Sequence, residues 1–266
     1  MTDHDIEVRT YFARGRNALV ARGSFSEMFA AWYLHRMDCG LVLPSGCDAL
    51  GRDALAAITL HCASRPHGET CAWTVHFPHP RVNVFAAGDN PTGWIVANVF
   101  NENIRPVGKG IFYSDVVEAG HPVRRSVAEF DGADFLGAAA QFYERSEQRA
   151  ARFFRLPDED FVLVSAQPDC DIAWLRGLDD PSAARMDSEV ELSLLETRRF
   201  RFACGCTHER MVDFLAPIFQ RQGDELFGGE ATVRIHCPRC GERHVITREA
   251  LEARAGEAPP AEPTDR

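Results

Sequence analysis

Two stretches near the C-terminus, "FACGCTHER" (Phe202–Arg210) and "HCPRCG" (His236–Gly241), carry a CxC and a CxxC motif. Structural zinc sites are tetrahedral and take four thiolates, commonly delivered as two short pairs. The two motifs in one C-terminal module therefore predict one zinc ion per chain. The predicted metal ligands are Cys204, Cys206, Cys237 and Cys240.

The residues around the motifs are consistent with a compact metal-binding module. In an extended strand, side chains two residues apart face the same side, so Cys204 and Cys206 can hold one ion. Pro238 favours a turn, and Gly241 can adopt a positive φ just after the last ligand. We expect a hairpin from strands at 231–236 and 243–247, and a helix at 209–222 that closes the module.

Four thiolates fill the coordination sphere of zinc, whereas a catalytic zinc keeps an open position. The sequence therefore does not predict a hydrolase or deaminase centre, and no catalytic residue is assigned. His208, His236 and His244 lie close to the cysteines in sequence. We expect them to be polar neighbours and not further ligands.

The CxC pair has a redox consequence. A bond between Cys204 and Cys206 requires the strand to bend, because Cα atoms two residues apart in a strand are about 6.6 Å apart. Oxidation would expel zinc and distort the backbone together. Structural zinc contributes about 10–16 kcal/mol in small modules, so its loss should unfold this one. The hypothesis from the residues is an oxidant-triggered unfolding switch.

The bulk properties limit the location and partners. The chain has 266 residues and a net charge of −10, which disfavours sequence-independent binding to nucleic acid. The N-terminus lacks the apolar region of a signal peptide, and the apolar runs are too short to span a bilayer. We therefore expect a cytoplasmic protein with reduced thiols. No role is assigned to the five other cysteines, Cys39, Cys47, Cys62, Cys71 and Cys170.

Periodicity predicts an α+β fold whose sheet is mostly antiparallel. The order is two helices, a run of strands, a helix and two more strands, which differs from βαβ alternation. We expect Ser24 to cap the first helix and Asp131 the third. The expected helices are 24–37, 47–63 and about 132–148; the expected strands are 70–77, 81–87, 93–100, 108–117, 121–130, 151–156 and 160–166.

Composition divides the chain into four segments. Residues 1–168 form the N-terminal α+β domain, and residues 169–193 form an acidic connector with one short helix at 170–178. The four-cysteine module covers residues 194–255. Residues 256–266 are rich in Pro, Glu and Ala and are expected to be disordered.

The cysteine motifs resemble those of the heat shock protein 33 (HslO) family of redox-regulated chaperones. The likeness rests on Cys204-Gly-Cys206 and Cys237-Pro-Arg-Cys240-Gly, with 207–236 between them. "FYERSEQ" (Phe142–Gln148) is similar to the family's Tyr-x-x-Ser-Glu-Gln element, and "GDNPTG" (Gly88–Gly93) to its Gly-Asp-Gly-Pro turn. The order of elements agrees over about residues 5 to 251. The connector looks shorter than the family's linker.

The resemblance implies a holdase that binds unfolding client proteins without ATP. In this family the reduced, zinc-bound form is inactive. Oxidation releases zinc and forms disulfides within each pair, here Cys204–Cys206 and Cys237–Cys240. The active form is expected to be a homodimer, with no nucleic-acid or membrane partner. The alternative is an enzyme or nucleic-acid-associated protein in which the zinc module is only structural.

Overall fold

The computed structural model of the protein describes residues 4–43 and 46–256. The chain divides into two compact units, Met1–Cys204 and Gly205–Arg266, and the division falls inside the CxC motif. Among the described helices, none is long and apolar enough to cross a bilayer.

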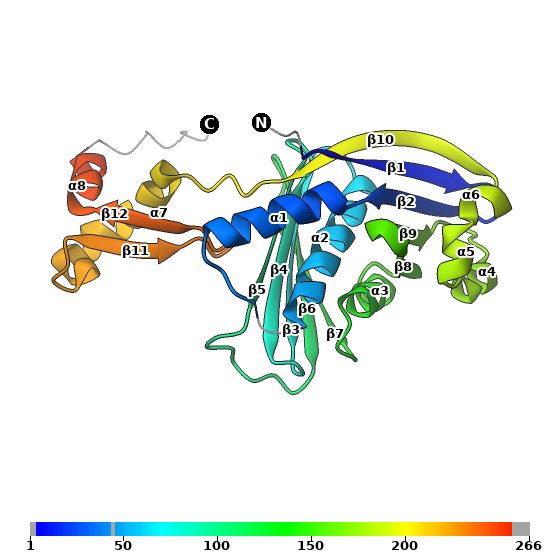
Figure 1. Ribbon diagram of the computed structural model, residues 1–266, viewed down its shortest axis with the longest axis horizontal. Helices are drawn as coiled ribbons and strands as arrows, with labels where there is room; N and C mark the ends of the chain where they lie inside the picture. Colours follow the sequence, from blue (N-terminus) through cyan, green and yellow to red (C-terminus); the bar gives the residue numbers. More distant parts are fainter. Residues whose placement is uncertain (1–3, 44–45, 257–266) are drawn as a thin grey trace. The chain divides into compact units, whose positions relative to one another are not determined.

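The first unit is built on a ten-stranded sheet in the order β7-β6-β3-β4-β5-β10-β1-β2-β9-β8 (Figure 1). Neighbouring strands are antiparallel except β5 and β10, which pair in parallel at Arg201 with Trp94 and Phe202 with Ile95. The predicted α+β fold with a mostly antiparallel sheet is therefore confirmed. The strands are β1 (Ile6–Ala13), β2 (Ala18–Ser24), β3 (Glu69–Phe77), β4 (Val82–Asp89), β5 (Trp94–Phe100), β6 (Gly110–Glu118), β7 (Arg124–Phe130), β8 (Ala151–Arg155), β9 (Asp160–Ala166) and β10 (Leu192–Phe202).

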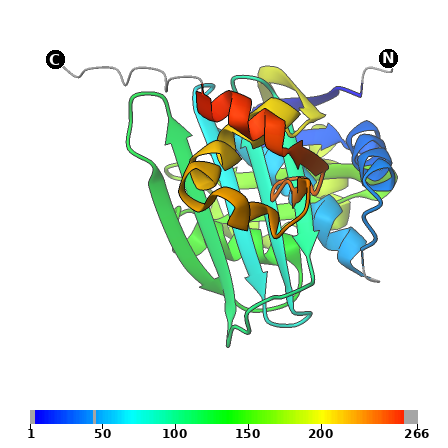
Figure 2. The same ribbon diagram turned by 90° about the vertical axis from the view of Figure 1, so that its left-hand side faces the viewer.

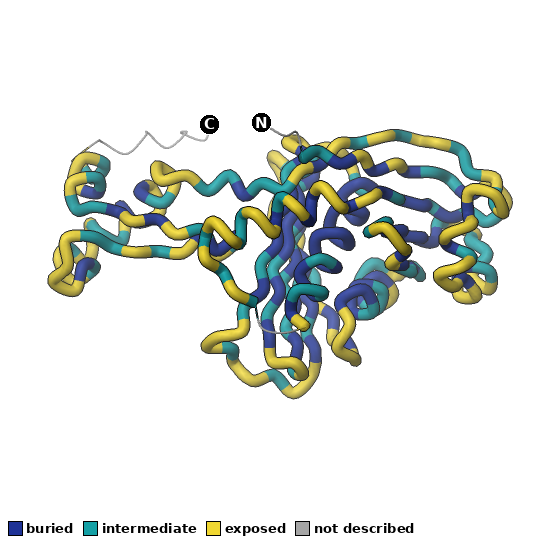
Figure 3. Tube along the Cα trace, viewed as in Figure 1, coloured by how far each residue is buried: buried dark blue, intermediate teal, exposed yellow. Residues whose placement is uncertain are grey.

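Three helices cover this sheet: α1 (Ser26–Asp38), α2 (Cys47–Ala63) and α3 (Phe135–Arg145). α2 is the central helix, and Figure 3 shows it buried along most of its length. Its alanines and leucines pack on the sheet, and Trp73 of β3, Phe112 of β6 and Phe142 of α3 form part of the same core. Apolar burial of this extent is the main source of stability in a domain of this size.

The predicted elements of the first unit are largely confirmed, but their caps differ, and the predicted order is wrong at its start because β1 and β2 precede the first helix. The expected strands between residues 70 and 130 are β3 to β7, with ends shifted by at most three residues. Ser24 does not cap the first helix, because it ends β2 and Phe25 takes the N-cap position. Asp131 does not cap α3; the Asp134 carboxylate accepts a hydrogen bond from the Gly137 N–H at 2.6 Å.

The connector is folded more extensively than the sequence predicts. It contains three short helices instead of one: α4 (Ile172–Gly177), α5 (Asp180–Ala184) and α6 (Met186–Glu189). The side chains of Asp171 and Asp179 cap the first two. Apolar side chains of these helices are buried together with side chains of β2, β8 and β9, so the connector packs on the sheet within the first unit; they include Leu175, Leu178, Ala183 and Met186.

The expected start of the C-terminal module at Leu194 differs from the observed division after Cys204. β10 pairs with β1 from Leu192 to Phe200, so this strand belongs to the sheet of the first unit. β10 is not an edge strand, because it lies between β1 and β5. Of the predicted tail 256–266, only Gly256 is described, and it ends a helix; the rest lies outside the described residues.

The second unit contains α7 (His208–Gln222), the 3-10 turn η2 (Gly223–Phe227), β11 (Thr232–His236), β12 (Arg243–Thr247) and α8 (Arg248–Gly256). Figures 1 and 2 show these elements in orange to red. β11 and β12 form the predicted antiparallel hairpin, and α7 confirms the predicted helix. The fully packed apolar core is small and consists of Val212, Leu215, Phe227, Ile246 and Leu251.

Candidate metal centre

The structure brings the four predicted cysteine ligands together. The sulfur atoms of Cys204, Cys206, Cys237 and Cys240 all lie within 4.8 Å of one another. The Cys206 and Cys240 sulfurs are 3.5 Å apart. Cys204 is 9% exposed, and Cys237 and Cys240 are each 2% exposed. Two motifs separated by thirty residues thus form one sulfur-lined site that is largely withdrawn from water.

The CxxC half of the site is a tight backbone turn. The Gly241 N–H donates to the Cys237 carbonyl at 2.8 Å, and the Cys237 N–H donates to the Glu242 carbonyl at 2.8 Å. The Arg239 N–H points at the Cys237 sulfur at 3.4 Å. Gly241 has φ of 79°, as the sequence predicts, because residues with a Cβ rarely adopt this conformation. The turn therefore places both sulfurs on one side before a metal binds.

The CxC half differs from the extended strand that the sequence predicts. β10 ends at Phe202, and the Ala203 N–H makes the last bond to β5, to the Ile95 carbonyl at 2.9 Å. Gly205 then takes φ of 68°, which turns the backbone between the two cysteines. The Arg210 guanidinium donates to the Gly205 carbonyl at 2.8 Å and holds this turn. The two sulfurs therefore converge through a glycine turn and not through strand alternation.

Two further polar side chains lie beside Cys206. The Cys206 thiol donates to the Glu242 carboxylate at 3.1 Å, and His244 is only 6% exposed. The ligating atoms of Cys206, Glu242 and His244 lie within 4.8 Å of one another. By contrast, His208 and His236 are exposed. Glu242 was not among the predicted site residues, and the sequence does not distinguish His244 from the other two histidines, although Glu242 directly follows the CxxC turn and His244 is two residues further on.

The geometry fits a structural zinc ion. Sulfurs bound to zinc at about 2.3 Å in a tetrahedron lie about 3.8 Å from one another. The observed separations, 3.5 Å for one pair and below 4.8 Å for the others, are close to that arrangement. Thiolates are the donors that zinc prefers in closed structural sites, so the donor set also fits.

The remaining cysteines belong to the first unit and do not form a comparable cluster among the described residues. Cys62 and Cys71 are fully buried. A hydrogen bond from Cys62 lowers the pKa of Cys71 to about 5, and the same interaction raises the pKa of Cys62 well above its ordinary value. Burial of both groups keeps this acidic thiol away from reagents in water.

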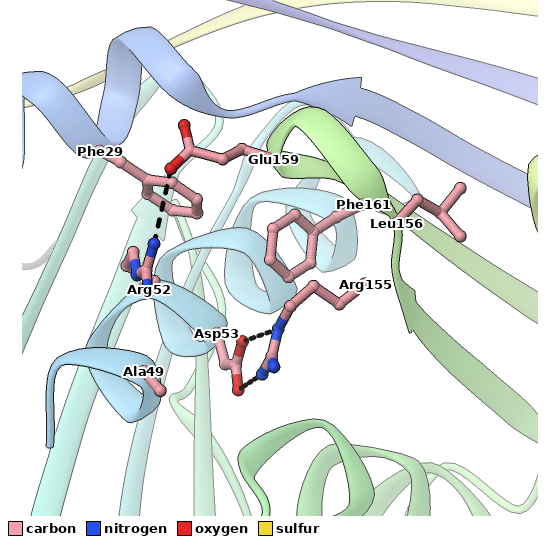
Figure 4. Close-up of a pocket in the computed structure, with 8 residues that line it drawn as sticks. All are labelled: Phe29, Ala49, Arg52, Asp53, Arg155, Leu156, Glu159 and Phe161. Carbon is pink, nitrogen blue, oxygen red and sulfur yellow. Dashed lines mark hydrogen bonds and ion pairs between the residues drawn. The ribbon is translucent and has the colours of Figure 1, made fainter. Parts of the chain in front are cut away.

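A cavity of about 110 Å³ in the first unit is lined by charged and aromatic side chains (Figure 4). Asp53 is buried and accepts two hydrogen bonds from Arg155, one of them at 3.1 Å. Arg52 pairs with Glu159 at 3.5 Å. The four charged groups are paired with one another, so the cavity is explained as a structural polar cluster and is not assigned a ligand.

Comparison with known proteins points to one family. The family model described as "Hsp33 protein" matches residues 173–247. The "33 kDa chaperonin" of Edwardsiella ictaluri is 30% identical over 76 residues, which is 28% of this chain and 26% of that protein. The "33 kDa chaperonin" of Aliivibrio salmonicida is 24% identical over 160 residues, 51% of this chain and 55% of that protein. The matched regions thus span about a quarter and about half of these relatives.

The fold of the whole chain agrees with these matches. The crystal structure of the 33 kDa chaperonin (heat shock protein 33 homolog) from Thermotoga maritima superposes with a TM-score of 0.67. The alignment covers 93% of this chain and 97% of that one, at 13% identity, so the likeness concerns the fold. The family model covers most of the segment that carries the four converging cysteines, and the relatives and the fold agree with it. The chain is therefore similar to the Hsp33 family in the sequence of this segment and to a member of that family in its fold.

Proposed function

We propose that the protein is a redox-regulated chaperone that binds unfolding proteins without ATP. The observation that carries the proposal is the convergence of four cysteine sulfurs in a unit with a small apolar core. The relatives bear the name of a chaperonin, and we propose that this chain likewise acts by binding proteins and not by catalysing a reaction.

In the reduced protein, Cys204, Cys206, Cys237 and Cys240 would hold one zinc ion. When bound, zinc supplies a crosslink between the end of β10, the N-terminal side of α7 and the β11–β12 turn. The apolar core of this unit has five buried side chains and seven partly buried ones packed against them. A core of this size contributes little free energy of folding without such a crosslink. Folding of residues 205–256 therefore depends on the sulfurs remaining thiolates.

Oxidation removes the ligands. Each pair of thiolates gives two electrons to one molecule of hydrogen peroxide, which takes up two protons and is reduced to two molecules of water, while one S–S bond forms. We propose the pairs Cys204–Cys206 and Cys237–Cys240. In the reduced site, Cys206 contacts Cys240 across the two motifs at 3.5 Å. Disulfides within each motif leave no covalent bond between Cys206 and Cys240. Oxidation therefore disrupts the site and does not crosslink the two motifs.

Loss of this unit would also affect client binding through the connector. Helices α4 to α6 follow β9 and precede β10, and their stability rests on a few buried side chains such as Leu175 and Met186. Release of these helices would expose apolar surface that unfolding client proteins can bind. We propose that the active form is a homodimer in the cytoplasm, without nucleic-acid or membrane partners.

Replacement of one ligand tests the proposal. The variant Cys237→Ser should contain no zinc, lose the ordered second unit and suppress aggregation of a heat-denatured client without oxidant. Cys170→Ser is the matched control, because Cys170 is a half-buried cysteine of the connector outside the cluster. The proposal is refuted if Cys237→Ser lacks zinc but still needs peroxide to protect the client.

A further inference from the structure

Two cysteines of the first unit, Cys62 and Cys71, lie against each other in its core. Cys62 is in the last turn of α2, Cys71 is the third residue of β3, and both are fully buried. Their thiols are hydrogen-bonded to each other. Among the described residues, neither belongs to a cluster that could hold a metal ion. The two thiols are therefore a pair of their own, separate from the four-cysteine site.

The backbone makes room for this contact at Gly88. Gly88 of β4 pairs with Cys71 of β3, and facing residues of an antiparallel pair share one side of the sheet. A Cβ atom added at Gly88 would lie 2.4 Å from the Cys62 sulfur. The Cys62 side chain therefore fills the space that a side chain of residue 88 would occupy, directly beside Cys71.

The two thiols differ in reactivity. The hydrogen bond from Cys62 lowers the pKa of Cys71 to about 5, against the opposing effect of burial. His61 and Arg65 lower this pKa as well. The thiolate is the form that reacts with peroxide, and the sulfenic acid that it gives condenses with a neighbouring thiol. Cys71 thus has the character of the attacking sulfur, and Cys62 that of the resolving one.

A short exposed segment lies next to the pair. Pro66, His67 and Gly68 connect α2 with β3 and are exposed. The ends of elements open at a lower free energy than the centre of a sheet. Opening of the last turn of α2 and the first residues of β3 exposes both sulfurs while the rest of the sheet stays folded. In the closed state burial protects the thiols, so the rate of their oxidation follows this opening.

We infer that Cys62 and Cys71 form a second redox pair, which peroxide oxidises to a disulfide when this segment opens and which then ties α2 to β3. The Cys71 thiolate attacks one oxygen of hydrogen peroxide, the O–O bond breaks, and uptake of one proton gives a sulfenic acid and water. The Cys62 thiol then attacks this sulfur, the S–S bond forms, and the S–O bond breaks to release a second water. The inference goes beyond the proposed function, because the oxidant that unfolds the second unit crosslinks the first.

Disulfide mapping of the peroxide-treated full chain tests the pairing. Remaining thiols are blocked in denaturant, and a glutamate-specific protease then cleaves after Glu69, between the two cysteines. Mass spectrometry should find the two fragments joined by Cys62–Cys71, and the joined species should form faster in urea below the unfolding transition. Recovery of both cysteines as blocked thiols, their linkage to other cysteines, or a rate that urea does not change overturns the inference. The proposed function is tested separately by zinc release and client protection.

A stability measurement tests whether the disulfide ties α2 to β3. All four tryptophans lie in the first unit, so their fluorescence reports on its unfolding in urea; they are Trp32, Trp73, Trp94 and Trp174. Closing the short loop from Cys62 to Cys71 should lower the unfolding equilibrium constant roughly 100-fold.

Peroxide should therefore raise the urea midpoint of the native chain but not that of Cys71→Ser, whose second unit is oxidised in the same way. Cys47→Ser is the matched control, because Cys47 is a buried cysteine whose pKa burial raises, and it should behave like the native chain. Equal midpoint shifts in all three chains, or no shift in the native chain, overturn the inference.

Discussion

Replacement of Gly205 by alanine tests whether the glycine turn builds the CxC half of the site. Gly205 lies between the two cysteines and has φ of 68°. Alanine at this φ is strained whatever space surrounds it, because its Cβ approaches the backbone. The native turn can persist only at that cost, and otherwise Cys204 and Cys206 no longer face the same ion.

The size of the effect follows from the backbone conformation. A left-handed conformation costs a residue with a Cβ roughly 1–2 kcal/mol. Metal binding is coupled to folding of the turn, so the strain appears in the metal affinity. A cost of one or two kcal/mol corresponds to a factor of about 5–30. Zinc affinity of Gly205→Ala should therefore fall by that factor, and Gly241→Ala, at φ of 79°, should behave similarly.

Competition between the reduced protein and a chelator of known zinc affinity measures this factor. Gly256→Ala is the control, because Gly256 lies in the same unit, has no positive φ and has open space around it. Unchanged zinc affinity in Gly205→Ala would show that the turn does not set the sulfur geometry. An equal loss in Gly256→Ala would show that the effect is not specific to the site.

Two further predictions concern the first unit. Arg155→Met leaves the carboxylate of Asp53 buried without its partner and should lower the free energy of unfolding by about 3 kcal/mol. This value is the low end for a buried ion pair, because half of the Arg155 side chain is exposed. Burial raises the pKa of Asp53 on folding, against the opposing effect of Arg155. The loss of unfolding free energy in Arg155→Met should therefore be largest at neutral pH and shrink as acid protonates the carboxyl. Urea unfolding that gives the same loss at every pH would contradict this prediction. Leu175→Ala should destabilise the packed connector by about 2–5 kcal/mol and speed amide exchange in 172–189, whereas Ile172→Ala, at a 37% exposed position, should have little effect; equal exchange rates in both variants would refute the packing of α4.

Local patterns predicted most of the fold correctly. β3 and most of β6 alternate buried and half-buried residues, and α2 carries a long run of helix-forming apolar residues. These signals lie within one element and are read from spacing alone. They also sufficed to predict the β11–β12 hairpin and α7.

Long-range pairing was not predictable in the same way. β10 pairs with β1, whose residues lie more than 170 positions earlier, and nothing in the basic strand at 196–202 identifies that partner. The short helices α4 to α6 lack a clear period, and they are stabilised by packing of residues such as Met186 on the sheet.

At the candidate site, the sequence identified the four cysteines because their spacing is specific. It did not predict how Cys204 and Cys206 converge, because a positive φ at Gly205 depends on the end of β10 and the start of α7. It also could not single out Glu242 and His244. Their approach to Cys206 results from folding of the hairpin against the CxC segment and is absent from any single motif.

Zinc content and client protection, measured on the same samples along a peroxide titration, test the central claim most directly. We predict about one zinc ion per reduced chain. Client protection should rise only as zinc is released, and both changes should reverse when a reductant and zinc are restored. Protection that is equal in the reduced and oxidised samples, or that rises while zinc stays bound, would contradict the account.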